Sequence, residues 1–143
     1  MRNVIENLSR QHRELVKAAT RMFGWLDPGR LQAGAPEAYK CLSTLTGILR
    51  VHLSMEDRSF YPSLLQHRDP SLRELARTFL DERAELERRY DAYRERWPSA
   101  QAIAGDAAAF VEHTREILGV LWQRMHDEDD RFHPEIIARW QAS

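Results

Sequence analysis

Six ionisable side chains stand in the sequence where a helical pattern calls for apolar residues. They are His12, His52, Glu56, Arg83, Arg124 and Glu128. Because each one continues an apolar stripe, we expect all six to point inward near one level of a helical protein. Burying so many ionisable groups is unfavourable unless they pair with one another or bind a metal ion. Ion pairing and metal binding are therefore the chemistry that this pattern indicates.

The six residues follow an internal repeat. In the first copy His52 follows His12 by 40 positions, and in the second copy Arg124 follows Arg83 by 41 positions. A glutamate lies four residues after the second member of each pair, and it is followed by Phe after four residues and by Pro after six. The same arrangement is thus written twice, first as His, His, Glu and then as Arg, Arg, Glu.

Four stretches with helical periodicity must position these residues, and none alternates as a β-strand would. The first stretch ends at the turn signal of residues 27–29, Asp-Pro-Gly. The second is predicted to begin near Pro36, a good first-turn residue, and to be kinked or ended by Pro62.

Ser71 and Glu74 form a capping-box pattern that predicts the start of the third helix, and Pro98 terminates it. Ser99 and Asp106 are alternative caps for the fourth helix, and the pattern does not distinguish them. The connections are short, so consecutive helices should be antiparallel neighbours. The sequence therefore predicts an all-α protein.

The predicted architecture is an up-down-up-down antiparallel four-helix bundle, with a short C-terminal helix after Pro134. A chain of 143 residues fits one domain, which we expect to span residues 1–143.

Composition narrows the functional classes. The formal net charge of −1 gives no field that would favour nucleic acid or anionic lipid, so neither partner is expected. The single cysteine, Cys41, excludes an internal disulfide and a thiolate metal cluster. No apolar run is long enough to span a membrane, and the first residues lack a signal-peptide core. We therefore expect a reducing, cytoplasmic location.

Four segments resemble the helices of the hemerythrin-like HHE cation-binding domains. Residues 52–62, HLSMEDRSFYP, resemble the signature of the second helix in that family, and residues 7–15, NLSRQHREL, resemble the first helix. Residues 79–89 and 125–134 resemble the third and fourth helices. Histidine is usual in the family where this chain has Arg83 and Arg124.

The resemblance implies a non-haem di-iron centre inside a four-helix bundle. Members of the family bind oxygen or nitric oxide, store or sense iron, or act in redox signalling and repair. Histidine and glutamate four residues apart lie on one helical face, and imidazole suits iron and zinc. By direct matching, the ligand positions in this chain are His12, His52, Glu56 and Glu128.

Three further features lie near Glu128, the last of these ligand positions. His126 lies two residues after Arg124 and should face away from the pocket, although a local bulge would make it a substitute ligand. The acidic run 127–130 is expected to face solvent apart from Glu128, and His133 is expected to be a surface or packing residue.

Arg83 and Arg124 depart from the family pattern, because a guanidinium stays protonated and cannot bind a metal. In one interpretation, the four matched residues hold a single iron or zinc ion, with Glu82 or Glu87 as a further ligand after a small rotation. In the other, the pocket holds no metal and the two arginines pair with the two glutamates. Two fixed cations beside two carboxylates leave little attraction for a divalent ion, so charge favours the second interpretation.

We therefore expect a degenerate di-iron site in a binding, sensing or regulatory protein of metal, oxygen or redox response, rather than an enzyme. One alternative is a working protein that binds non-haem iron or a single zinc or iron ion. Another alternative is a metal-free helical regulator that binds a protein partner through its outer face. The sequence does not indicate the oligomeric state.

Overall fold

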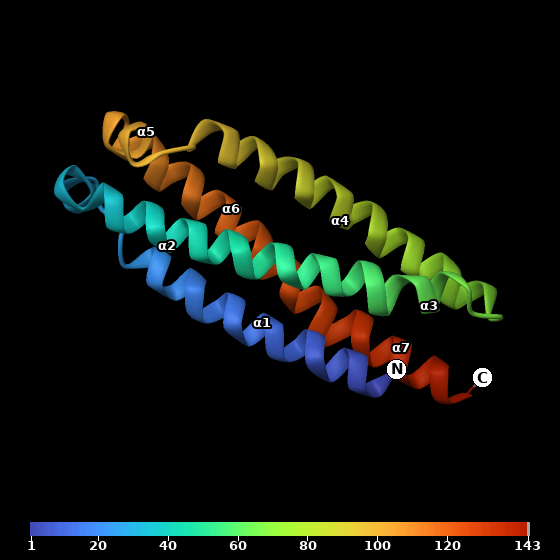
Figure 1. Ribbon diagram of the computed structural model, residues 1–143. Helices are drawn as coiled ribbons and strands as arrows, with labels where there is room; N and C mark the ends of the chain where they lie inside the picture. The colour runs from blue at the N-terminus through green and yellow to red at the C-terminus, as the bar shows by residue number, and fades with distance from the viewer. Residues whose placement is uncertain (143) are drawn as a thin grey trace.

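The computed structural model describes residues 1–142, and these form helices and connections without strands. Four helical rods run side by side in alternating directions, and both termini lie at the same end (Figure 1). The first two rods are α1 (Arg2–Phe23) and the series α2 (Pro28–Met55), η1 (Glu56–Phe60) and α3 (Tyr61–Leu65). The other two are α4 (Pro70–Arg96) and the series α6 (Ala107–Asp127), η2 (Glu128–Phe132) and α7 (His133–Ala142). The up-down-up-down four-helix bundle that the sequence predicts is confirmed, including the short helix around Pro134.

The predicted start of the second helix is wrong, because α2 begins at Pro28 and runs through Pro36. Asp27 caps this helix by accepting a hydrogen bond from the backbone N–H of Arg30, and Pro28 favours the first helical turn. Pro36 has no N–H to donate along the helix. In Figure 1 the first turns of α2 accordingly lie at an angle to its long straight part.

The starts of the later helices also depend on aspartate and serine caps. The capping box predicted at Ser71 is not the start of α4, because Asp69 is the cap and Pro70 is the first helical residue. Ser99 and Asp106 both act as caps. Ser99 begins the short α5 (Ala100–Gly105), and Asp106 begins α6. Figure 1 shows α5 at the end of the bundle away from the termini.

Two π-helical segments, η1 and η2, interrupt the second and fourth rods. Each begins at a glutamate of the sequence repeat, Glu56 or Glu128. A π-helical turn holds more residues than an α-helical turn, so the side chain five positions after each glutamate faces inward again. These side chains belong to Tyr61 and His133, and both are buried.

A polar layer separates two hydrophobic clusters along the bundle. The cluster toward α5 includes Leu15, Leu49, Leu86 and Leu121. The cluster toward the termini includes Leu8, Phe60, Phe79 and Phe132. We define the polar layer as the ionisable residues that lie between them in the four rods: His12, His52, Glu56, Arg83, Arg124 and Glu128. All six are buried, as the periodicity predicts.

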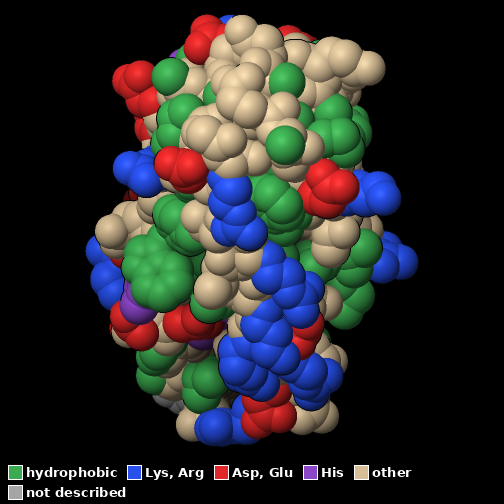
Figure 2. Space-filling model, turned by 90° about the vertical axis from the view of Figure 1, so that its left-hand side faces the viewer, with side chains coloured by type: hydrophobic (Ala, Val, Ile, Leu, Met, Phe, Trp, Pro, Cys, Tyr) green, Lys and Arg blue, Asp and Glu red, His purple; other side chains and the backbone are tan. Residues whose placement is uncertain are grey.

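The outer faces of the helices are mixed in character. Figure 2 views the end of the bundle that carries α5, and hydrophobic side chains reach its surface between charged ones. The large apolar side chains with the greatest exposure are Phe23, Val51 and Trp122. Among the described residues, no helix combines the length and the apolar content that a membrane crossing requires.

Phe110→Ala tests the cluster toward α5. Phe110 is fully buried and its ring lies 5.2 Å from that of Trp97. Because the truncation leaves a cavity, we expect the free energy of unfolding to fall by about 3–5 kcal/mol. Val51→Ala, at an exposed position, should change it by less than about 0.5 kcal/mol. Urea denaturation measures both, and a loss below about 1 kcal/mol for Phe110→Ala would contradict this packing.

Candidate metal centre

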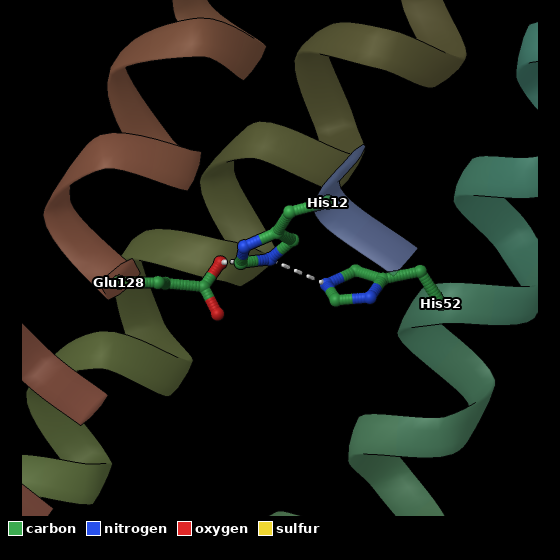
Figure 3. A group of neighbouring side chains, drawn as sticks. All are labelled: His12, His52 and Glu128. Carbon is green, nitrogen blue, oxygen red and sulfur yellow. Dashed lines mark hydrogen bonds and ion pairs between the residues drawn. The ribbon is translucent and has the colours of Figure 1, made fainter. Parts of the chain in front are cut away.

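Two imidazole rings meet at the centre of the polar layer. Nε2 of His12, in α1, lies 3.2 Å from Nε2 of His52, in α2, and 3.9 Å from Oε1 of Glu128, in η2. Figure 3 shows these side chains converging from three rods. Their ligand atoms all lie within 4.8 Å of one another, and the three residues are buried. The sequence pattern therefore brings three of its four predicted ligands into one group.

The other nitrogen of each ring is held by an acceptor. Nδ1 of His12 lies 2.8 Å from Oδ1 of Asp129, and Nδ1 of His52 lies 2.8 Å from Oε1 of Gln11. An ionised carboxylate and an amide oxygen only accept hydrogen bonds, so each Nδ1 carries the ring proton. Burial and the nearby His12 lower the pKa of His52 to about 3. With its proton on Nδ1 and its pKa lowered, the neutral His52 ring points the lone pair of Nε2 at Nε2 of His12.

The separation of the two Nε2 atoms matches that of two ligands on one ion. Nitrogens bound at about 2.1 Å, with an angle of roughly 90–110° between the bonds, lie about 3.0–3.4 Å apart. The two Nε2 atoms are 3.2 Å apart, and a cation between them would bind both. With Glu128, the rings make a donor set of two nitrogens and one oxygen, which suits iron and zinc.

The two buried glutamates of the layer differ in acidity. Burial raises the pKa of Glu56 well above its usual range, and the carboxylate of Glu128 raises it further. Burial also acts on Glu128, but contact with His133 and the charge of Arg124 hold its pKa below the usual range. Glu128 is therefore the anionic member. Oε1 of Glu56 lies 3.8 Å from Nε2 of His52.

Arg83 is held mainly by Asp57, and not by Glu56 as the sequence suggests. Its guanidinium donates to both carboxylate oxygens of Asp57, at 2.6 and 3.0 Å, and to Glu87 at 3.0 Å. The nearest approach of Arg83 to Glu56 is 3.8 Å. Asp57 and Glu87 are both partly exposed, so Arg83 is neutralised from the outer side of the layer.

Arg124 makes the pairing with Glu128 that the sequence predicts. Its Nε donates to Oε1 of Glu128 at 3.1 Å, and its Nη2 donates to the hydroxyl of Tyr61 at 3.0 Å. Oε2 of Glu82 lies 3.7 Å from Nη1. Glu82 and Glu87, the residues considered as rotated ligands, are thus each engaged with an arginine.

The structure corrects the prediction for Asp129 and, of the two alternatives expected for His133, surface or packing, it shows packing. Asp129 is not simply solvent-facing, because it accepts the hydrogen bond from His12 with its side chain 38% exposed. His133 is no surface residue, because it is buried with Nε2 3.7 Å from Oε2 of Glu128. The π segment η2 explains His133, since its wider turn returns this residue to the layer. His126 faces outward and lies 3.2 Å from an exposed aspartate.

The sequence repeat extends to the partners of the polar layer. The residue after each glutamate, Asp57 or Asp129, contacts a residue from the other half of the chain, Arg83 or His12. Each aspartate directly follows a glutamate of the repeat, so the repeat could have identified both aspartates as partners of the polar layer. The two halves build one pseudo-symmetric layer, with imidazoles from one half and guanidinium groups from the other.

Buried polar atoms without hydrogen bonds gather in and beside this layer. Among residues 1–142, six buried side-chain nitrogen or oxygen atoms have no hydrogen bond. Five of them belong to Glu56, Arg124, Glu128 and His133, and the sixth is Nε1 of Trp97. The glutamate oxygens and the His133 nitrogens are atom types that bind metal ions, whereas the Arg124 nitrogen is only a donor.

The chain is thus an all-α bundle with a site of histidines and carboxylates between its helices. Helical bundles hold metal ions in sites of this kind, built from side chains on facing helices. The family model of the Hemerythrin HHE cation binding domain matches residues 3–136. The chain therefore belongs to the hemerythrin HHE cation-binding family. Comparisons with curated proteins and with solved structures gave no match.

Arg124→Met tests the buried ion pair. The change keeps much of the apolar stem but leaves the anionic Glu128 without its guanidinium partner. We therefore expect the metal-free protein to lose about 3–5 kcal/mol of unfolding free energy. Arg88→Met removes an exposed partner of Glu85 and should cost less than about 1 kcal/mol. Urea denaturation of both variants measures the difference, and equal losses would contradict the pairing described here.

Proposed function

We propose that this protein binds one divalent metal ion, iron or zinc, through His12, His52 and Glu128. We further propose that it is a binding or sensing protein in metal, oxygen or redox response. The supporting observation is the approach of two imidazole Nε2 atoms to 3.2 Å while both Nδ1 atoms are engaged elsewhere. An ion between the two nitrogens would form two coordinate bonds at a separation that suits two ligands of one ion.

The surrounding residues support this ligand set. Asp129 and Gln11 fix the tautomer and the orientation of the rings, as partners of metal-binding histidines commonly do. Glu56 and His133 flank the group and have buried atoms without hydrogen bonds, so either supplies a fourth ligand after a small movement. A bound ion supplies Lewis acidity and, in the case of iron, one-electron redox chemistry. Glu128 contributes the negative charge.

The charged side chains around the site favour a bound cation more than the sequence alone indicates. Counting two arginines against two glutamates favours a metal-free pocket. Four further carboxylates lie against the same groups: Asp57, Glu82, Glu87 and Asp129. Because Asp57 and Glu87 neutralise Arg83 from outside, its charge opposes an ion between the imidazoles less strongly.

We propose one ion rather than the two that the family resemblance implies. In the repeat, Arg83 and Arg124 stand where His12 and His52 stand in the first half. A guanidinium offers only donors, so this half of the layer lacks the nitrogen ligands that a second ion needs. The site is in this sense a degenerate di-iron centre in which one half retains its ligands.

Elemental analysis of protein purified from cells supplied with iron and zinc tests the proposal. We expect about one ion per chain in the wild type and almost none in His52→Ala, because the variant loses one of two imidazole ligands. His126→Ala removes an exposed histidine and should retain the ion. Wild-type protein without metal, or His52→Ala with wild-type content, would refute the metal site.

The repeat generates a second test of the same proposal. The double variant Arg83→His with Arg124→His restores an imidazole at both positions, so the metal content should rise from about one to about two ions per chain. The matched control is Arg88→His with Arg89→His on exposed positions of α4, which should leave the content unchanged. If the first double variant still holds one ion, the arginines are not what limits the site to a single metal.

A further inference from the structure

A cavity separate from the polar layer lies between α1 and α6. Its volume is about 370 Å³, within the range of small-molecule sites. Leu15, Ala19 and Phe23 form one wall, and Leu118, Trp122 and Met125 form the other. Phe23 and Trp122 are 52% and 50% exposed, so the cavity reaches the surface beside two aromatic side chains. Exposed apolar surface of this kind commonly marks a binding site.

One charged side chain, that of Arg115, belongs to the cavity lining. Its guanidinium donates to the carbonyl of Leu26 at a long 3.4 Å. Within residues 1–142, Arg115 forms no ion pair with a carboxylate. The cavity therefore combines apolar walls with one cation whose charge is not neutralised by the protein.

Gly119 lines the cavity at an exposed position inside α6. A Cβ atom there would meet no atom within 4 Å, and no glycine of the described chain has a positive φ. A larger side chain at this position therefore has room to extend into the open space at the cavity.

We propose that this cavity binds a medium-chain aliphatic carboxylic acid. The apolar chain lies between the walls of α1 and α6, where its burial drives binding. The carboxylate pairs with Arg115, whose charge complements it. This site is independent of the metal proposal, because its lining contains none of the proposed metal ligands.

Calorimetric titration of the full chain with decanoate tests the proposal. We expect one saturable site, and octanoate should bind about tenfold more weakly because two fewer methylene groups are buried. Arg115→Gln should weaken decanoate binding about tenfold. It should leave the binding of neutral decanol, measured by competition, unchanged. Equal losses for decanoate and decanol would overturn the role of Arg115.

Gly119→Leu should abolish binding by filling the cavity. The matched control is Gly47→Leu, at an exposed glycine inside α2 where a Cβ also meets nothing within 4 Å and which does not line the cavity. Circular dichroism checks that both variants fold. Absence of saturable decanoate binding by the wild type, or wild-type binding by Gly119→Leu, would overturn the proposal. So would sedimentation showing a wild-type dimer that Gly119→Leu dissociates, because a second copy would then fill the cavity.

Discussion

Ionisable groups buried between two hydrophobic clusters must find partners across the bundle, and this requirement governs how the four rods face one another. Removing a charge from water is costly unless another charge or hydrogen bond replaces the solvent. Here part of the replacement comes from a different rod, as when Asp129 contacts His12 and Asp57 contacts Arg83. Apolar packing above and below tolerates some exchange of side chains. The polar pairs constrain the rotation of each rod much more narrowly.

The two halves of the layer show how one scaffold accepts different chemistry. His12 and Arg83 occupy corresponding places and both donate to an aspartate that follows a glutamate. An imidazole held in this way keeps a second nitrogen free to bind a metal, whereas a guanidinium has only further donors. The same acceptors therefore support a half with ligands and a half with fixed cations. Exchange of one for the other changes the capacity for metal without changing the fold.

Helical periodicity explains why the bundle and the depth of the six residues are predictable from the sequence. It does not by itself place His133 beside the layer, because α-helical spacing does not hold across a turn that is π-helical. It also misplaces the start of α2, since Pro36 is tolerated inside that helix and does not begin it. The charge balance of the site is harder still to predict from the sequence. Asp57 lies on a partly exposed face, and its partner Arg83 belongs to a different rod. The residues around Asp57 in the sequence do not indicate that partner.

The two π segments couple chain length to the architecture of the interior. A π turn holds more residues than an α turn, so deleting one residue within η2 would leave an ordinary α-helical turn in its place. Ile136, fully buried against the other rods, would then keep its inward face. The same argument applies to η1 and Leu64. A deletion in a regular part of a rod would instead rotate everything after it by about 100°. One-residue changes in length are therefore tolerated at the two π segments and in the connections between rods.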